Sequence, residues 1–178
     1  MVYIINTVCT GNICRSAMAK IVLKKAFANI KEVQINSSAI SGEEEGNRMD
    51  SRAAEILENS GFVDQKVDID NHIAHKVTSE ELKKTDLFLA FTHKHANYLI
   101  RAGANPQKVY MYRQFETIWN PNSYVDRQGS VEDIIDPWYG DMDDFAIALE
   151  QIMDCTRNIV KFVSNNLKLE NNIELEKN

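Results

Sequence analysis

The sequence predicts an α/β fold, a doubly wound, four-stranded parallel sheet with helices on both faces. Apolar or alternating runs typical of strands occur at residues 2–8, 32–37, 86–91 and 109–111. Helix-forming stretches separate these runs, and strands that alternate with helices indicate a parallel sheet with right-handed crossovers. After Asp86 the third run is continuously apolar, as expected of a strand buried on both faces.

The first strand leads into a tight loop and then into a helix at residues 17–27, which is rich in alanine, lysine and other helix formers. Asp50, or alternatively Asn47, is a suitable N-cap for a second helix that ends near Gly61. The sequence therefore places one helix behind each of the first two strands.

Residues 62–77 show no clear period and are expected to form a loop. Thr78 is the expected N-cap of a short helix over residues 79–84. Glu81 stands at the position of the reciprocal capping-box residue.

A further helix is expected at residues 92–102, stopped by Gly103. Residues 114–135 have no clear period and are expected to be irregular. Asp141 then leads a long helix in which apolar residues recur at helical spacing.

Length and composition indicate one globular domain. The chain has 178 residues, of which 44% are hydrophobic and 26% charged. We expect the domain to cover residues 1–167 and to be followed by a polar, frayed C-terminal tail, residues 168–178. The net charge of −6 disfavours nucleic acid and anionic membranes as partners.

No basic region followed by an apolar core opens the chain, and its longest apolar run is far short of the roughly 20 residues of a membrane span. We therefore expect a cytoplasmic protein without a membrane span. Its three cysteines, Cys9, Cys14 and Cys155, are expected to be reduced. No Cys or His pairs stand at the spacing of a zinc site, so neither a metal nor another cofactor is expected.

The loop after the first strand has the composition of an anion-binding site. It reads Cys9-Thr10-Gly11-Asn12-Ile13-Cys14-Arg15-Ser16. Ligands of parallel sheets bind at the carboxyl ends of the strands, and backbone N–H groups at a helix N-terminus attract phosphate. Gly11 allows a close approach, Asn12 tolerates a left-handed conformation, and Arg15 can grip two oxygens of the anion.

The same positive field favours the ionised form of the Cys9 thiol, which can then attack phosphorus. Ser16 can donate a hydrogen bond to that thiolate. The alternative interpretation is an ordinary turn with a small buried cysteine, because this spacing of Cys, Arg and Ser also occurs by chance. The strand before the loop and the helix after it favour the catalytic interpretation.

The run from Val8 to Ser16 resembles the signature loop of the low-molecular-weight protein tyrosine phosphatases, and the likeness extends from residue 1 to about Phe162. The resemblance implies that the predicted anion loop is a phosphatase loop. It also implies that the partners are phosphotyrosine-containing proteins, with a tyrosine kinase as one candidate. We expect a monomer or a weak dimer.

A phosphatase also needs an acid to protonate the leaving group. Asp136-Pro137-Trp138-Tyr139-Gly140 matches a segment of the family, and the match implies that Asp136 is the general acid and, after it has lost its proton, the base. By itself this stretch reads as a turn before the long helix. Its pairing with the Cys9 loop favours the catalytic role, with Arg15 stabilising the charge on the phosphate oxygens.

The expected substrate is phosphotyrosine. Trp138 and Tyr139 would flank the cleft, and aromatic walls suit a phenyl ring. In the family an aliphatic residue at the position of Ile13 goes with phosphotyrosine, whereas threonine goes with phosphoarginine. Glu43 stands where the family often has a large cleft-wall residue, and two further glutamates follow it. This acidic rim would favour basic phosphopeptides, or it is simply a solvated run of charge.

Supporting roles follow from the resemblance. Ser37 and His72 match residues that buttress the asparagine of the loop, here Asn12. Cys14 either forms a reversible disulfide with Cys9, as in relatives, or is a small residue that packs the loop. Matches at Gly46, Asp50, Arg52 and Ala53 lie at the start of the second helix, where capping and packing explain them.

Three other functions fit parts of the sequence. Thioredoxin-coupled arsenate reductases share the fold and the loop pattern, but they need further cysteines, and residues 72–105 contain none. Phosphoarginine phosphatase is disfavoured by Ile13 and faintly supported by Thr10 and Met18. A catalytically silent phosphotyrosine-binding module is disfavoured because the nucleophile, the arginine and the acid are all retained.

Overall fold

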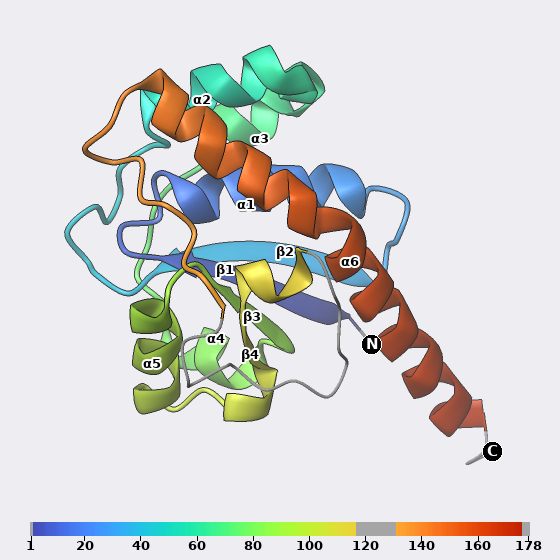
Figure 1. Cartoon of the computed structure of the whole chain (residues 1–178). Helices are drawn as coiled ribbons and strands as arrows, with labels where there is room; N and C mark the ends of the chain where they lie inside the picture. The colour runs from blue at the N-terminus through green and yellow to red at the C-terminus, as the bar shows by residue number, and fades with distance from the viewer. Residues whose placement is uncertain (1, 117–130, 176–178) are drawn as a thin grey trace.

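The computed structural model describes residues 2–116 and 131–175. Its sheet is built from β1 (Tyr3–Cys9), β2 (Val33–Ala39), β3 (Leu87–Ala90) and β4 (Val109–Met111). The strand order is β2-β1-β3-β4 and every pairing is parallel (Figure 1). The predicted four-stranded parallel sheet is therefore confirmed, and β1 lies between two neighbours.

Helices cover both faces of the sheet. They are α1 (Arg15–Ala26), α2 (Ser51–Leu57), α3 (Lys66–Asp70), α4 (Ser79–Lys84), α5 (His93–Arg101) and α6 (Met142–Leu175). α1, α2, α3 and α6 lie on one side of the sheet, and α4 and α5 lie on the other (Figure 1). The larger apolar core is shared by α1, α6 and the sheet, and a smaller core lies beneath α5.

Capping explains where the helices of the second face begin and end. Thr78 and Glu81 form the predicted capping box at the start of α4. The side chain of Thr92 accepts from the backbone N–H of His95 and caps α5. Gly103 follows this helix with a φ of 108°, a conformation that glycine adopts without strain.

The structure differs from the predicted elements in two places. Residues 62–77 were expected to form a loop, but they contain α3, which buries Ile69 and places Asp68 beside Lys24. The period was hidden because Val63 and Val67 of this stretch are exposed. α6 continues to Leu175, so much of the segment expected to be a frayed tail is helical.

Within residues 114–135, expected to be irregular, positions 117–130 lie outside the described residues. Those from 131 to 135 form neither helix nor strand, whereas Tyr112–Phe115 is a short 3-10 helix. Across the part of the chain that the structure describes, no helix is long and apolar enough to cross a membrane.

Candidate active site

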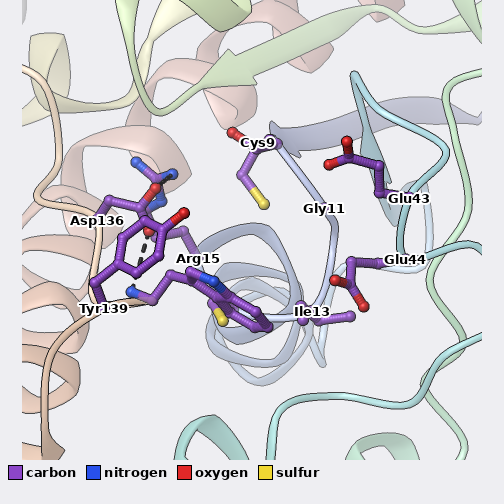
Figure 2. A pocket seen from close by; sticks show the side chains of 11 residues that line it. Cys9, Gly11, Ile13, Arg15, Glu43, Glu44, Asp136 and Tyr139 are labelled. Atoms are coloured by element: carbon purple, nitrogen blue, oxygen red, sulfur yellow. Dashed lines mark hydrogen bonds and ion pairs between the residues drawn. The ribbon is translucent and has the colours of Figure 1, made fainter.

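The carboxyl end of β1 opens into a pocket of about 170 Å³. It is lined by Cys9, Thr10, Gly11, Ile13, Cys14, Arg15, Glu43, Glu44, Asp136, Trp138 and Tyr139. Figure 2 shows the Cys9 thiol between Asp136 and Tyr139 on one side and the two glutamates on the other. The structure thus brings together the predicted loop, residues 9–16 (the phosphate loop), and the predicted acid, which are far apart in the sequence.

Two groups can donate hydrogen bonds to the Cys9 sulfur. The backbone N–H of Asn12 donates to Sγ at 3.3 Å, and Ser16 Oγ lies 3.0 Å from it. Asn12 Nδ2 donates to Ser16 Oγ at 2.8 Å. Because that bond uses the hydroxyl oxygen as acceptor, the hydroxyl proton is free to point at the sulfur. Both donors point at the sulfur atom that faces the pocket.

Asn12 is the residue around which the phosphate loop is folded. Its φ of 61° lies in the left-handed region, and it is the one non-glycine residue with a positive φ in the described chain. Its side chain bonds at both ends, because Oδ1 also accepts from the backbone N–H of His75 at 3.3 Å. The expectation of a left-handed, locally bonded Asn12 is confirmed.

The predicted support from His72 and Ser37 takes a different form. His72 is buried, and its Nε2 donates to the backbone carbonyl of Asn12 at 2.7 Å rather than to its side chain. Ser37 is also buried, but its hydroxyl has no hydrogen-bond partner among the described residues. The Asn12 amide is already engaged by Ser16 and His75, so the predicted contact with Ser37 is wrong.

Burial lowers the pKa of His72 to about 4, although its hydrogen bond with the backbone of Asn12 acts in the opposite direction. The imidazole is therefore neutral at neutral pH, with its Nε2 proton fixed by the carbonyl that it meets. A neutral His72 supports the phosphate loop without adding charge to it.

Arg15 joins the phosphate loop to Asp136. It is buried, and its Nη2 lies 2.6 Å from Asp136 Oδ2 while Nη1 donates to the carbonyl of Ile134 at 3.1 Å. Its Nε is buried as well, and no described residue accepts from it. A buried donor without a partner is costly, and an anion held in the loop would satisfy it.

Asp136 lies in a stretch without helix or strand, residues 131–141, here called the Asp136 segment. Ile134 anchors it, because its side chain is buried and its N–H donates to Phe91 at the end of β3. Asp133 accepts from the backbone N–H of His93 at the start of α5. The segment is therefore tied to the same edge of the sheet as the phosphate loop.

Trp138, Tyr139 and Glu43 line the pocket, as predicted for a cleft, and the following Glu44 lines it too. A Cβ added to Gly11 would lie 2.9 Å from Glu44 Cγ, so the absence of a side chain at Gly11 lets this glutamate reach the loop. The two acidic side chains thus form one wall of the pocket, opposite Tyr139 (Figure 2).

The other two cysteines are buried free thiols, as is Cys9. Burial, followed by the charges of Asp50 and Cys9, raises the pKa of Cys14 well above its usual range. Burial likewise raises the pKa of Cys155, to about 12. Both thiols are protonated at neutral pH and are weak nucleophiles.

Sequence reasoning missed His95. It is buried, and its Nε2 lies 2.9 Å from Thr10 Oγ1 of the phosphate loop. Burial, followed by the charges of Arg15 and Lys94, lowers its pKa to about 3, so it too is neutral. Its position just after a strand, at the edge where the other ligand-binding residues meet, is the signal that could have found it.

The chain matches the family model described as low molecular weight phosphotyrosine protein phosphatase over residues 4–169. It is 34% identical over 146 residues to low molecular weight protein-tyrosine phosphatase A of Mycobacterium tuberculosis, covering 78% of this chain and 77% of the relative. It is 26% identical over 156 residues to the protein-arginine-phosphatase of Bacillus subtilis, covering 86% and 92%.

A crystal structure of a protein tyrosine phosphatase from Entamoeba histolytica aligns with 92% of this chain and 98% of its own, with a TM-score of 0.78 and 22% identity. This similarity shows a common fold. The chain therefore belongs to the low molecular weight phosphotyrosine protein phosphatase family, enzymes that hydrolyse phosphoric monoesters.

Proposed function

We propose that the chain hydrolyses phosphotyrosine in proteins through a cysteinyl-phosphate intermediate. The Cys9 thiolate attacks phosphorus and the bond to the phenolic oxygen breaks, while Asp136 gives its proton to that oxygen. Arg15 and the backbone N–H groups of the phosphate loop stabilise the charge on the other three oxygens. The observation that carries the proposal is the approach of Asp136 and Arg15 to one pocket that holds the Cys9 thiol.

In the second step water attacks the cysteinyl phosphate, and Asp136, now a carboxylate, accepts a proton from it. The S–P bond breaks, and the thiolate leaves with inorganic phosphate as the product. The hydrogen bonds from Ser16 and from the backbone of Asn12 support this step, because they stabilise the sulfur anion that departs.

Tyrosine is the preferred substrate residue because the pocket combines the aliphatic Ile13 with the aromatic walls of Trp138 and Tyr139. Phosphoarginine is the second candidate, since the Bacillus subtilis relative is named a protein-arginine-phosphatase. Ile13 offers no hydroxyl to a guanidinium group. The acidic wall of Glu43 and Glu44 supports substrates with basic residues near the phosphotyrosine.

One panel tests these statements. Wild type, Cys9→Ser and Asp136→Ala are assayed on a phosphotyrosine peptide, on phosphoarginine and on an aryl phosphate. We expect Cys9→Ser to lose about 10⁴-fold or more in kcat. Asp136→Ala should lose about 10²-fold or more on the peptide.

Undiminished turnover by Cys9→Ser would refute the mechanism, and a higher kcat/KM for phosphoarginine would refute the choice of tyrosine. Peptides that carry flanking lysines or flanking glutamates test the acidic wall, with Glu43→Gln as the variant that should narrow the difference between them. A cytoplasmic location, a phosphotyrosine protein or tyrosine kinase as substrate, and a monomer or weak dimer are part of the same proposal.

A further inference from the structure

Arg52 lies between the two halves of the site without lining the pocket. It is the second residue of α2, and its Nε and Nη2 donate to the two carboxylate oxygens of Asp50 at 3.1 and 2.9 Å. On its other side, Nη1 donates to the carbonyl of Gly140 at 2.9 Å and Nη2 to that of Trp138 at 3.3 Å. One guanidinium therefore binds a helix start and the end of the Asp136 segment together.

Two aromatic rings hold this guanidinium in place. Its central carbon lies 4.6 Å from the centroid of the Phe145 ring and 5.9 Å from that of Trp138. α2 lies beside the first turns of α6, which carry Phe145 (Figure 1). The side chain is only 32% exposed. An arginine that is stacked and bonded on both sides is a fixed spacer rather than a mobile surface charge.

The Asp50 end of this connection reaches the phosphate loop. The backbone N–H of Asp50 donates to the carbonyl of Ile13 at 3.0 Å. Burial by itself would raise the pKa of Asp50, but hydrogen bonds from the side chain and backbone of Arg52 lower it below its usual value. The carboxylate is therefore ionised at neutral pH, and it fixes Arg52 relative to the loop.

The other end reaches the expected acid. The backbone N–H of Trp138 donates to Asp136 Oδ1 at 3.2 Å, while Asp136 Oδ2 meets Arg15. Arg52 holds Trp138 by its carbonyl oxygen, so the residue that orients the Asp136 carboxyl group is itself held from α2. A continuous set of polar contacts thus runs from Ile13 through Arg52 to Asp136.

We propose that Arg52 is a positioning residue that sets the placement of Asp136 relative to the phosphate loop, and hence the transfer of a proton to the leaving group. This inference rests on the proposed function, because it takes Asp136 as the general acid. It goes beyond capping and packing, which would make Arg52 matter for stability alone. The distinction can be measured, because a misplaced acid slows hydrolysis most for the substrates whose leaving group most needs a proton.

The test uses two aryl phosphates, 4-nitrophenyl phosphate with a good leaving group and phenyl phosphate with a poor one. Their kcat/KM values report the step that needs the acid. We expect Arg52→Met to lower kcat/KM for phenyl phosphate about 10- to 100-fold and that for 4-nitrophenyl phosphate only a few-fold. Combined with Asp136→Ala, Arg52→Met should add no further loss, because the group that it positions is gone.

Arg48→Met is the matched control. Arg48 also donates to a backbone carbonyl, that of Asp70, and has no hydrogen bond or ion pair with the Asp136 segment among the described residues. It should leave both kcat/KM values unchanged. Arg52→Lys keeps the charge but cannot span both carbonyls and the carboxylate. Arg52→Lys should show the same dependence on the leaving group, with a smaller loss in kcat/KM. It replaces Arg52→Met in the test if the methionine variant does not fold.

Equal losses on the two substrates, or full additivity with Asp136→Ala, would overturn the role of Arg52 while leaving the phosphatase proposal intact. The phosphatase proposal fails separately, by an active Cys9→Ser variant or by a wild type that hydrolyses neither aryl phosphate.

Discussion

The phosphate loop and the Asp136 segment meet in one pocket but are held in different ways. The Cys9 thiol is bonded within the loop, to the backbone of the left-handed Asn12 and to Ser16, while His72, His75 and His95 support the loop from outside. The Asp136 segment has no regular structure, and its fixed points belong to other elements: Phe91 at the end of β3, Arg15 in α1 and Arg52 in α2. Cys9, the proposed nucleophile, is therefore placed mainly by its own loop, and Asp136, the proposed acid, by groups from distant elements.

This difference indicates how sensitive the placement of Cys9 and the placement of Asp136 are to changes elsewhere in the protein. Bonds within the loop place the Cys9 thiol, which therefore depends less on any one distant side chain. A segment held by distant side chains shifts when any one of them is altered, and about 1 Å of misplacement can cost about 10²-fold in rate. Substitutions at distant side chains are therefore expected to impair protonation of the leaving group more than nucleophilic attack.

Arg15→Lys should produce the largest effect, because Arg15 belongs to both regions. An ammonium cannot reproduce the planar fork that bonds to Asp136 and to the carbonyl of Ile134 and that, in the proposed mechanism, also holds the phosphate oxygens. We expect kcat/KM for an aryl phosphate to fall about 10³-fold. Arg48→Lys serves as the control, and a loss below tenfold would mean that the comparison assigns Arg15 too large a role.

Acidification should weaken the support of the phosphate loop. The pKa of His72 is lowered to about 4 and that of His95 to about 3, whereas an unfolded chain titrates near 6.5. Between pH 6.5 and 4 the unfolded state binds more protons, so the free energy of unfolding falls as the pH falls. We expect a loss on the order of 3 kcal/mol from His72, measured by urea unfolding from pH 7 to pH 4.

His72→Asn should flatten this pH dependence. His75 is the matched control, because the hydrogen bond that it donates to Glu81 raises its pKa and its stabilising contribution is lost only as the pH rises above 6.5. His75→Asn should therefore leave the acid limb unchanged. If the acid limb keeps its slope in His72→Asn, the loop does not depend on a neutral imidazole.

Asn12→Ala and Asn12→Gly separate the backbone of the loop from its side-chain bonds. Alanine strains the left-handed conformation and also loses the bonds to Ser16 and His75, so we expect a loss of about 2 kcal/mol in the free energy of unfolding. Glycine adopts the conformation freely and should lose about 1 kcal/mol. Equal losses in urea unfolding would show that the left-handed turn is not under strain.

Gly140→Ala and Gly11→Ala should give the smallest effects. They compare how much stability a Cβ costs in the Asp136 segment and in the phosphate loop. A Cβ at Gly140 would overlap the carboxyl group of Asp144, which accepts from the backbone N–H of Asp141. Its displacement should cost about 1 kcal/mol in stability and a few-fold in kcat/KM for phenyl phosphate. A Cβ at Gly11 meets only the stem of Glu44, which can move aside, so a stability change within about 0.5 kcal/mol is expected. If thermal unfolding shows a larger loss of stability for Gly11→Ala than for Gly140→Ala, the proposed difference between the two regions is wrong.

Local signals predicted the parts of the molecule that depend on neighbours in the chain. The strand, loop and helix around Cys9 were predictable because their residues are consecutive, and Thr78 and Thr92 mark helix starts by capping alone. α3 was missed because it buries little besides Ile69 and leaves Val67 exposed, which hides its period.

The support of the site was harder to predict. His95 contacts the phosphate loop at a separation of 85 positions and Arg52 the Asp136 segment at a separation of 88, so the local sequence does not identify their partners. The expected Ser37 contact failed for the converse reason, since the Asn12 amide had nearer partners in Ser16 and His75. A single sequence indicates which groups are available but not which of them will compete for one partner.

The short bond between Arg15 and Asp136 means that the Asp136 carboxylate competes with an incoming anion for the Arg15 guanidinium. A carboxylate of the same chain lies 2.6 Å from the guanidinium. An oxyanion that bonds to the same guanidinium nitrogen must displace this carboxylate, so its measured affinity includes the free energy of breaking the ion pair. The ion pair therefore disfavours an anion that offers a single oxygen more than one that also bonds to the backbone of the loop.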